Sequence, residues 1–136
     1  VAASTGTFYG QAMTVGNIYT VAGDGQRGSS GDGGPATAAE LVLSSVAADA
    51  AGNLVIADGG NERVRVVAAS TGTFYGQAMT AGYIYTVAGD GHCGFSGDGG
   101  PATSAELDLV GTVAADGTGD LYLGGDFPGR IREVTS

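Results

Sequence analysis

The chain contains one sequence unit twice. Residues 1–14 (VAASTGTFYGQAMT) are identical to residues 67–80, which sets a period of 66 residues. Over the first 43 residues only seven positions differ from their counterparts: Val15, Asn17, Gln26, Arg27, Ser29, Ala38 and Val42. The spacing then lengthens by one residue, since the VAAD sequence at 46–49 returns at 113–116. Repetition at such a period indicates a repeat architecture, so we divide the chain into repeat one, residues 1–66, and repeat two, residues 67–136.

Each period predicts four short strands. In repeat one they are 18–22 (IYTVA), 45–49 (SVAAD), 53–58 (NLVIAD) and 63–68 (RVRVVA), all rich in β-branched or small residues. Residues 50–53 and 59–61 read as tight turns, residues 23–35 as a Gly-Asp loop, and residues 36–43 have room for one helical turn. Short strands joined by tight turns, without a long helix between them, predict an all-β fold of antiparallel sheets.

In combination these segments resemble the NHL-repeat family of β-propellers. The motifs are V-A-A-D, G-N-L-V-I-A-D, N-E-R-V-R-V-V and I-Y-T-V-A-G-D-G…G-D-G-G-P-A-T, and they cover essentially the whole chain. The resemblance is closest to bacterial members with a Gly-Asp-rich loop after the outermost strand. It implies blades of four antiparallel strands, ordered from axis to rim as VAAD, NLVIAD, RVRVV and IYTVAG. Repeat two departs from the pattern, because 121–126 (LYLGGD) lacks the Asp at the equivalent strand end and 127–129 (FPG) replaces the Gly-Asn-Glu turn.

With this strand order, residues 1–136 form a single β-propeller segment that is open at both ends. The outer strand at 18–22 comes first, a whole blade follows, and three strands within 112–134 end the chain. Exposed strand edges invite pairing with another chain, so we expect 18–22 to complete the three strands of a neighbouring copy. The residues expected to pair are Ile18, Tyr19, Thr20, Val21, Arg130, Ile131, Arg132, Glu133 and Val134.

Two outcomes of this pairing stay open. Three chains would give a ring of about six blades, within the usual range for propellers, whereas a rotation that does not close would give a filament. The competing hypothesis is that the chain is a fragment of a longer propeller. Near-identity of the repeats fits each case.

Composition excludes several function classes. The chain has 27 Gly and 14 acidic residues against 5 basic ones, all Arg, for a net charge of −9. Affinity for a phosphate backbone comes from basic residues that release counterions, so we expect no nucleic-acid partner. No stretch approaches the apolar length of a membrane span, so we expect no membrane insertion. The absence of Lys and the low charged fraction favour an extracellular or cell-surface location.

The loop carboxylates are the only metal candidates. Asp24, Asp32, Asp90 and Asp98 could offer oxygens to Ca²⁺, which takes six to eight of them. Their spacing is neither that of an EF-hand nor that of the calcium-binding β-helix repeat. We therefore expect turn-forming aspartates and no cofactor.

The arginines and the lone cysteine suggest structural roles. Arg63 and Arg65, like Arg130 and Arg132, are two residues apart and share a sheet face. The family resemblance implies ion pairs with Asp58 at the end of the preceding strand, and Asp126 is the candidate substitute in repeat two. Cys93 is the only cysteine. We interpret it as a small loop residue, with an intermolecular disulfide or a reactive thiol as alternatives.

No residue pattern indicates an enzyme. His92 is the only histidine, so neither a His cluster nor a repeated Ser-His-Asp triad is available. Some propellers of this kind are zinc-dependent enzymes with His and Asp in the central channel, and nothing here matches that set. We expect a non-catalytic binding or scaffold module that self-assembles, with a protein or glycan ligand. The alternatives are a fragment of a longer propeller enzyme and a structural filament subunit.

Overall fold

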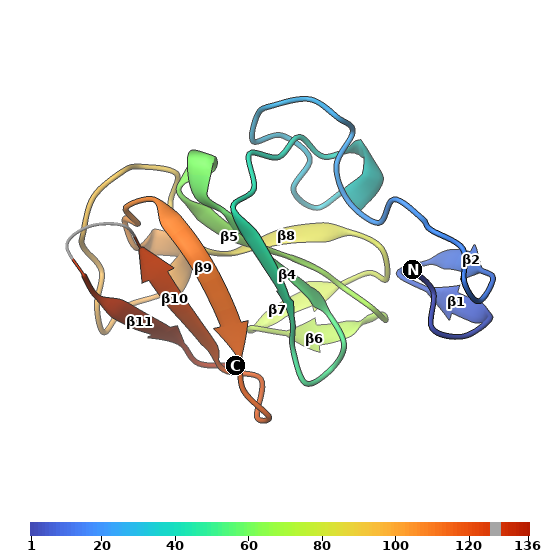
Figure 1. Ribbon diagram of the computed structural model, residues 1–136. Helices are drawn as coiled ribbons and strands as arrows, with labels where there is room; N and C mark the ends of the chain where they lie inside the picture. The colour runs from blue at the N-terminus through green and yellow to red at the C-terminus, as the bar shows by residue number, and fades with distance from the viewer. Residues whose placement is uncertain (126–128) are drawn as a thin grey trace.

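The computed structural model describes residues 1–125 and 129–136 and shows an all-β chain of several small antiparallel sheets (Figure 1). The strands are β1 (Gly6–Phe8), β2 (Gln11–Met13), β3 (Ser45–Ala48), β4 (Leu54–Asp58), β5 (Arg63–Val67), β6 (Gly72–Phe74), β7 (Gln77–Met79), β8 (Ile84–Ala88), β9 (Val110–Ala115), β10 (Leu121–Gly125) and β11 (Ile131–Val134). Three 3-10 turns accompany them: η1 (Ala36–Ala38), η2 (Gly59–Asn61) and η3 (Ala102–Ser104).

The first large sheet has four strands in the order β3-β4-β5-β8. All its pairs are antiparallel, and β4 and β5 lie in full register from Leu54 opposite Val67 to Asp58 opposite Arg63. Four of the five residues in each of these two central strands are buried. Burial on both faces explains why β4 (LVIAD) is a nearly continuous apolar run. β5 (RVRVV) alternates instead, and it buries Arg65 among its valines.

The second sheet repeats the first but has three strands, in the order β11-β10-β9. It corresponds to β5, β4 and β3 of the first sheet, so β11 lies at an edge where β5 has β8 beside it. A chain segment equivalent to β8 does not follow β11 within the described residues. The second sheet therefore presents an unpaired strand edge.

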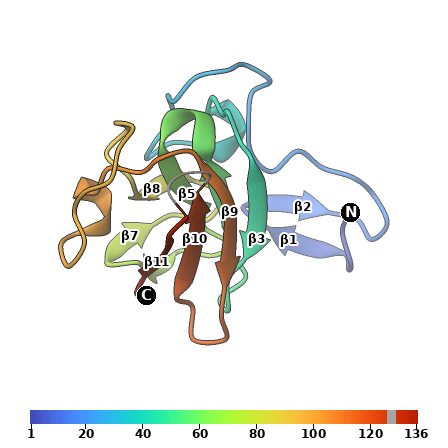
Figure 2. The same ribbon diagram turned by 60° about the vertical axis from the view of Figure 1, so that its left-hand side comes forward.

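The two sheets pack face to face and share one hydrophobic core (Figure 2). Val55, Val64 and Val66 of the first sheet meet Val113 and Leu121 of the second, and all five are buried. Removing these apolar side chains from water into a closely packed core is a large favourable contribution to the free energy of folding. A smaller cluster lies between the first sheet and the loop that contains η1, with Ala36, Ala39, Ile56, Val67 and Ile84.

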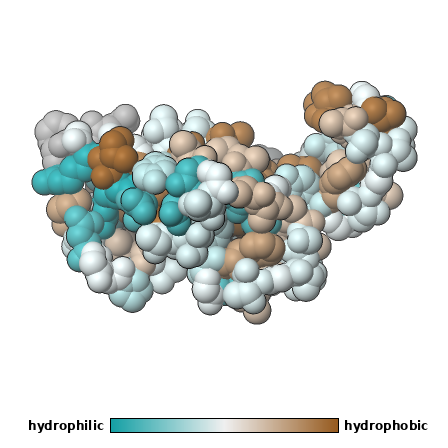
Figure 3. All heavy atoms as spheres, turned by 90° about the horizontal axis from the view of Figure 1, so that it is seen from below, coloured by the Kyte–Doolittle hydropathy of each residue, from teal (hydrophilic) through white to brown (hydrophobic). Residues whose placement is uncertain are grey.

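Two hairpins of identical sequence stand outside these sheets. β6 and β7 pair beneath the first sheet, where Met79 joins the main core. β1 and β2 pair in the same register but project from the body at the N-terminal end (Figure 1). Seen from below, this hairpin is a separate lobe with apolar surface (Figure 3). The Tyr9 hydroxyl ties this hairpin to the body by donating a hydrogen bond to the Gly52 carbonyl at 2.9 Å.

Most predicted strands are confirmed to within a residue or two. Segments 45–49, 53–58 and 63–68 correspond to β3, β4 and β5, and the predicted helical turn within 36–43 is η1. The two short hairpins were not predicted as separate sheets. The predicted role of Asp126 and the replaced turn at 127–129 rest on residues 126–128, which lie outside the described part of the chain.

The prediction of a strand at 18–22 is wrong for the single chain. Residues 17–21 run without strand pairing, although their duplicate in repeat two is the strand β8. Residues 18–22 and 84–88 have the same sequence and differ in whether a partner strand lies beside them. β8 has β5 to bond with, whereas no described strand lies beside 18–22, and a strand exists only as part of a ladder.

Packing between the sheets predicts unequal effects for two equivalent leucines. Leu121→Ala should lower the free energy of unfolding by about 2–5 kcal/mol, because Leu121 is fully buried between the sheets. Leu54, its counterpart in repeat one, is only partly buried at the outer side of the first sheet, so Leu54→Ala should cost less. Urea unfolding of both variants measures the two values. Equal losses would contradict the packing described here.

Candidate functional site

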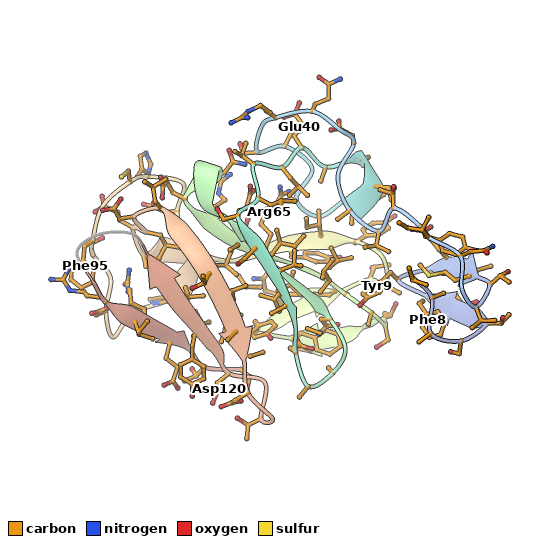
Figure 4. All side chains as sticks on the ribbon, viewed as in Figure 1. Phe8, Tyr9, Glu40, Arg65, Phe95 and Asp120 are labelled. Carbon is orange, nitrogen blue, oxygen red and sulfur yellow. The ribbon has the colours of Figure 1, made fainter. Side chains whose placement is uncertain are left out.

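A buried arginine fastens the Gly-Asp loop to the first sheet. The Arg65 side chain is fully buried, and Figure 4 shows it beneath the loop that carries Glu40. Its Nε and Nη2 contact Asp32 Oδ1 at 2.9 and 2.8 Å, and Nη1 donates to the Glu40 carbonyl at 2.8 Å. Nη2 also donates to the Ser30 carbonyl at 3.1 Å. The guanidinium thus holds both arms of the loop against β5.

The expected ion pair with Asp58 is present as well. Asp58 is fully buried and lies 3.4 Å from Arg65 Nη1. Its other contacts are the Asn61 amide at 2.9 Å and the Val42 backbone N–H at 2.7 Å. Buried charges persist only when they are paired and hydrogen-bonded, as these are. Arg63, two residues before Arg65, forms no ion pair with Asp58 in the described structure.

Repeat two rebuilds the arrangement around Arg132. Its Nε donates to Asp98 Oδ1 at 2.9 Å, Nη1 to the Glu106 carbonyl at 2.8 Å and Nη2 to the Ser96 carbonyl at 2.8 Å. Gly125 stands where the first sheet has Asp58, so the buried acidic partner is replaced. The Phe95 ring contacts the arginines of this repeat, with Arg130 at 3.9 Å and Arg132 at 5.0 Å from the ring centroid.

The two arginine sites differ in exposure. The Arg132 side chain is 17% exposed and that of Asp98 is 66% exposed, against 0% for Arg65 and 42% for Asp32. In the first sheet β8 covers the pair, and the Thr86 hydroxyl donates to Asp32 Oδ2. The second sheet has no strand in this position within the described residues, so the Arg132–Asp98 pair faces an open groove.

This groove lies between β11 and the loop around η3. A cavity of about 320 Å³ is lined by residues 97–100 and Ala105 on one side, by Leu107 and Leu123 at its base, and by 131–134 along its edge. A second cavity, of about 590 Å³, shares Gly100, Ala102, Glu133 and Val134 with it and extends it toward the β6–β7 hairpin. Together they make a channel along the free edge of β11.

The residues predicted to pair between chains lie at the two ends of the molecule. Figure 4 places Phe8 of the N-terminal hairpin and Phe95 beside β11 at opposite ends. Ile18 is 84% exposed, although its duplicate Ile84 is fully buried, and Ile131 is 74% exposed, although its counterpart Val64 is fully buried. Arg130 lies just outside β11, whereas Ile131, Arg132, Glu133 and Val134 form it. The chain does not bring the two sets together.

The candidate calcium ligands have other partners. Asp24 accepts the Gln26 backbone N–H and Asp90 that of His92, each at 2.8 Å, so both form turns as expected. The pKa of Asp90 is lowered, first by this hydrogen bond. Asp32 and Asp98 pair with arginines. Across residues 1–125 and 129–136, no group of three or more His, Cys, Asp and Glu side chains is placed to hold a metal ion.

Two features of the site were not predicted. The Ser30 and Glu40 backbone carbonyls bind Arg65, and the Phe95 ring stacks on Arg130 and Arg132. The carbonyl contacts had no signal in the sequence, because any residue carries a backbone carbonyl and most positions of the loop recur unchanged. The Phe95 contact had a weak one. Phe95 replaces Ser29 in the same repeat that loses Asp58, a paired change whose meaning only the contact reveals.

No protein-family model matches the chain, and no curated protein is significantly similar to it in sequence. In the described part of the chain, no helix is long and apolar enough to cross a membrane. A functional interpretation therefore depends on the geometry of this chain alone.

The buried arginine leads to a stability prediction. Arg65→Met should lower the free energy of unfolding by about 3–5 kcal/mol, since it leaves the buried Asp58 without its cation. Arg132→Met is the matched control and should cost less, because its acidic partner is largely exposed to water. Thermal and urea unfolding of both variants test this. A larger loss for Arg132→Met would contradict the assigned roles.

Cys93 leads to a prediction about reactivity. It is exposed, but its thiol donates to Asp108 Oδ1 at 3.3 Å, and this hydrogen bond, together with nearby Glu62 and Glu106, raises the pKa of the thiol. Because the thiolate is the reactive form, alkylation by iodoacetamide at pH 8 should be slower than that of a free cysteine. Asp108→Asn should speed it. Equal rates for both proteins would show that Asp108 does not control the thiol.

Proposed function

We propose that the chain is a non-catalytic scaffold module of the β-propeller kind, resembling NHL repeats, that assembles head to tail by completing an unfinished sheet. In this proposal each large sheet is a blade. Residues 18–22 of one copy supply the fourth strand to β9–β11 of the next. The location we propose is extracellular, and the assembled surface would present sites for a protein or glycan ligand.

The observation that carries the proposal is the paired exposure of duplicated residues. Ile18 and Ile131 are 84% and 74% exposed, while their counterparts Ile84 and Val64 are fully buried in the first sheet. Val64 there lies opposite Ala88, and Ile84 opposite Val67, across the β5–β8 pair. Ile18 is therefore an exposed copy of a residue that the chain buries beside Val67 of β5. Ile131 corresponds to Val64, which packs against the second sheet, so its exposure marks a sheet face that no further sheet covers within the described residues. An unpaired strand edge such as that of β11 favours association.

The geometry supports a head-to-tail arrangement. The N-terminal hairpin and β11 lie at opposite ends of the molecule (Figure 1), so one copy cannot satisfy both of its own ends. A contact between two different surfaces gives a ring if the rotation closes and a filament if it does not. Three chains with two sheets each would form a ring of about six blades, within the usual range.

A second candidate function is favoured by one observation. Ala2 bonds to Gly16 and Asn17 as Ala68 bonds to Gly82 and Tyr83, so the repeat pattern continues through the first residues. This fits a segment of a longer propeller, in which further repeats of the same chain would flank these two. In that case an enzymatic role would belong to residues outside this segment.

Size-exclusion chromatography with light scattering tests the proposal. We expect a species of about three chain masses for a ring, or a mass that grows with concentration for a filament. Because each chain carries a net charge of −9, association should strengthen as salt screens the repulsion. Ile18→Asp should abolish it, while Val15→Asp, at an exposed position outside the strand, should not. A single chain mass at all concentrations would refute self-assembly.

A further inference from the structure

The groove beside β11 has a filled counterpart in the same molecule. In the first sheet the loop around η1 and the strand β5 enclose β8. The Ile84 N–H donates to the Gly34 carbonyl at 3.0 Å, and the Ile84 carbonyl accepts the Gly33 N–H at 2.7 Å. The Ala36 N–H donates to the Gly82 carbonyl at 2.9 Å. The corresponding groups in repeat two, on Gly99, Gly100 and Ala102, line the open groove.

The segment that fills the first groove also exists in duplicate. Residues 82–88 (GYIYTVA) differ from residues 16–22 (GNIYTVA) only at Asn17. Both are held by the same local contacts. The Tyr19 hydroxyl accepts the Thr14 N–H at 2.9 Å, as Tyr85 does from Thr80, and Gln11 donates to the Thr20 carbonyl at 2.9 Å, as Gln77 does to Thr86 at 2.8 Å. The segment is thus already ordered before it has a partner strand, which lowers the entropic cost of docking.

The first residues of the chain already occupy one end of this segment. The Gly16 N–H donates to the Ala2 carbonyl at 2.9 Å, and the Ala2 N–H donates to the Asn17 carbonyl at 3.0 Å. In the first sheet Ala68, which directly follows β5, makes the same two bonds to Gly82 and Tyr83, at 2.8 and 3.1 Å. Thr135 is the residue that corresponds to Ala68 after β11. Ala2 therefore holds the place that Thr135 of another copy would need.

We propose that the groove beside β11 is a binding site for residues 16–22 of a second copy, in the register of the β5–β8 pair, and that docking replaces Ala2 of the incoming copy by Thr135. Transferring that register places Ile18 opposite Val134, Tyr19 opposite Glu133, Thr20 opposite Arg132 and Ala22 opposite Ile131. This proposal rests on the proposed self-assembly, to which it adds the register of the docked strand and a competing contact at Ala2.

The polar centre of the site gives it specificity. The Thr20 hydroxyl takes the place of Thr86 and donates to Asp98, whose Oδ1 is already bound by Arg132. Arg132 in turn fixes the loop through the Ser96 and Glu106 carbonyls. The strand thus enters a slot whose two walls are held at a set spacing, and a one-residue slip would put an apolar side chain on Asp98.

A matched pair of threonine variants tests the register. Thr20→Val should weaken association about tenfold, the usual effect of losing a hydrogen bond to a charged group, and should leave the unfolding temperature of the dissociated chain unchanged. Thr86→Val removes the same bond inside one chain, so it should lower that temperature and leave association unchanged. Association of Thr20→Val equal to that of the unmodified chain would overturn the proposal.

Disulfide trapping tests the same contact covalently. Ile84 bonds to the loop rather than to Val67, so the pair is of the closer, non-hydrogen-bonded kind in which Cα atoms approach to about 4.5 Å. In a Cys93→Ser background, Ile18→Cys with Val134→Cys should therefore link chains on mild oxidation. Ile18→Cys with Ile131→Cys, three residues out of register, should not. Ladders that stop at three chains indicate a ring, and longer ladders indicate a filament.

Removal of residues 1–3 tests the competing contact. Without Ala2 the incoming segment no longer has to release its own pairing, so association should become several-fold tighter. Unchanged or weaker association would refute the replacement step.

These experiments separate the two proposals. If the chain associates but Thr20→Val is neutral and the Ile18→Cys, Val134→Cys variant forms no links between chains, the groove proposal is wrong and assembly proceeds by another surface. If the chain is monomeric throughout, self-assembly is wrong. A synthetic peptide of residues 14–23 then tests the groove by itself against its Thr20→Val analogue. Equal binding by the two peptides, or no binding, would overturn the site as well.

Discussion

The structure depends on a buried guanidinium that joins a loop to a strand. Arg65 binds Asp32, Asp58 and two loop carbonyls while its own side chain is fully buried. The loop would otherwise be a flexible run of glycines, for which ordering is entropically costly. Once fixed, it forms one wall of a slot whose other wall is β5, and β8 lies in that slot. Arg132 fixes the second loop in the same way, so the second slot has its shape without a strand inside it.

The sequence predicted those strands whose formation depends mainly on their own residues and on the turns beside them. The strands β3, β4 and β5 follow from short apolar runs bounded by turn residues, and the duplicated unit predicted that the second sheet would repeat the first. The strand at 18–22 could not be predicted correctly for a single chain, because identical residues form a strand at 84–88 and none at 18–22. The decisive factor is a neighbouring strand far away in sequence, and propensity does not contain it.

In the candidate site, too, some contacts could be predicted from the sequence and others could not. The resemblance to NHL repeats implied the pair of Arg65 with Asp58, and the geometry contains it. The contacts to Asp32 and to the loop carbonyls required the folded loop, since Asp32 lies 33 residues before Arg65. In repeat two Gly125 stands at the position of Asp58, and the Phe95 ring contacts both Arg130 and Arg132. The sequence alone does not show this contact between Phe95 and the arginines, because the residues are far apart along the chain.

Two copies of one segment therefore exist in two environments within one molecule. Residues 82–88 lie between β5 and the loop around η1. Residues 16–22 and β11 lie toward opposite ends of the molecule (Figure 1), and the equivalent groove beside β11 is open. Amide hydrogen exchange measured against protein concentration compares them directly. The account predicts that 84–88 are protected at every concentration, whereas 18–22 and 131–134 become protected together as concentration rises. Fast exchange of 18–22 at all concentrations, or protection of 131–134 without them, would contradict it.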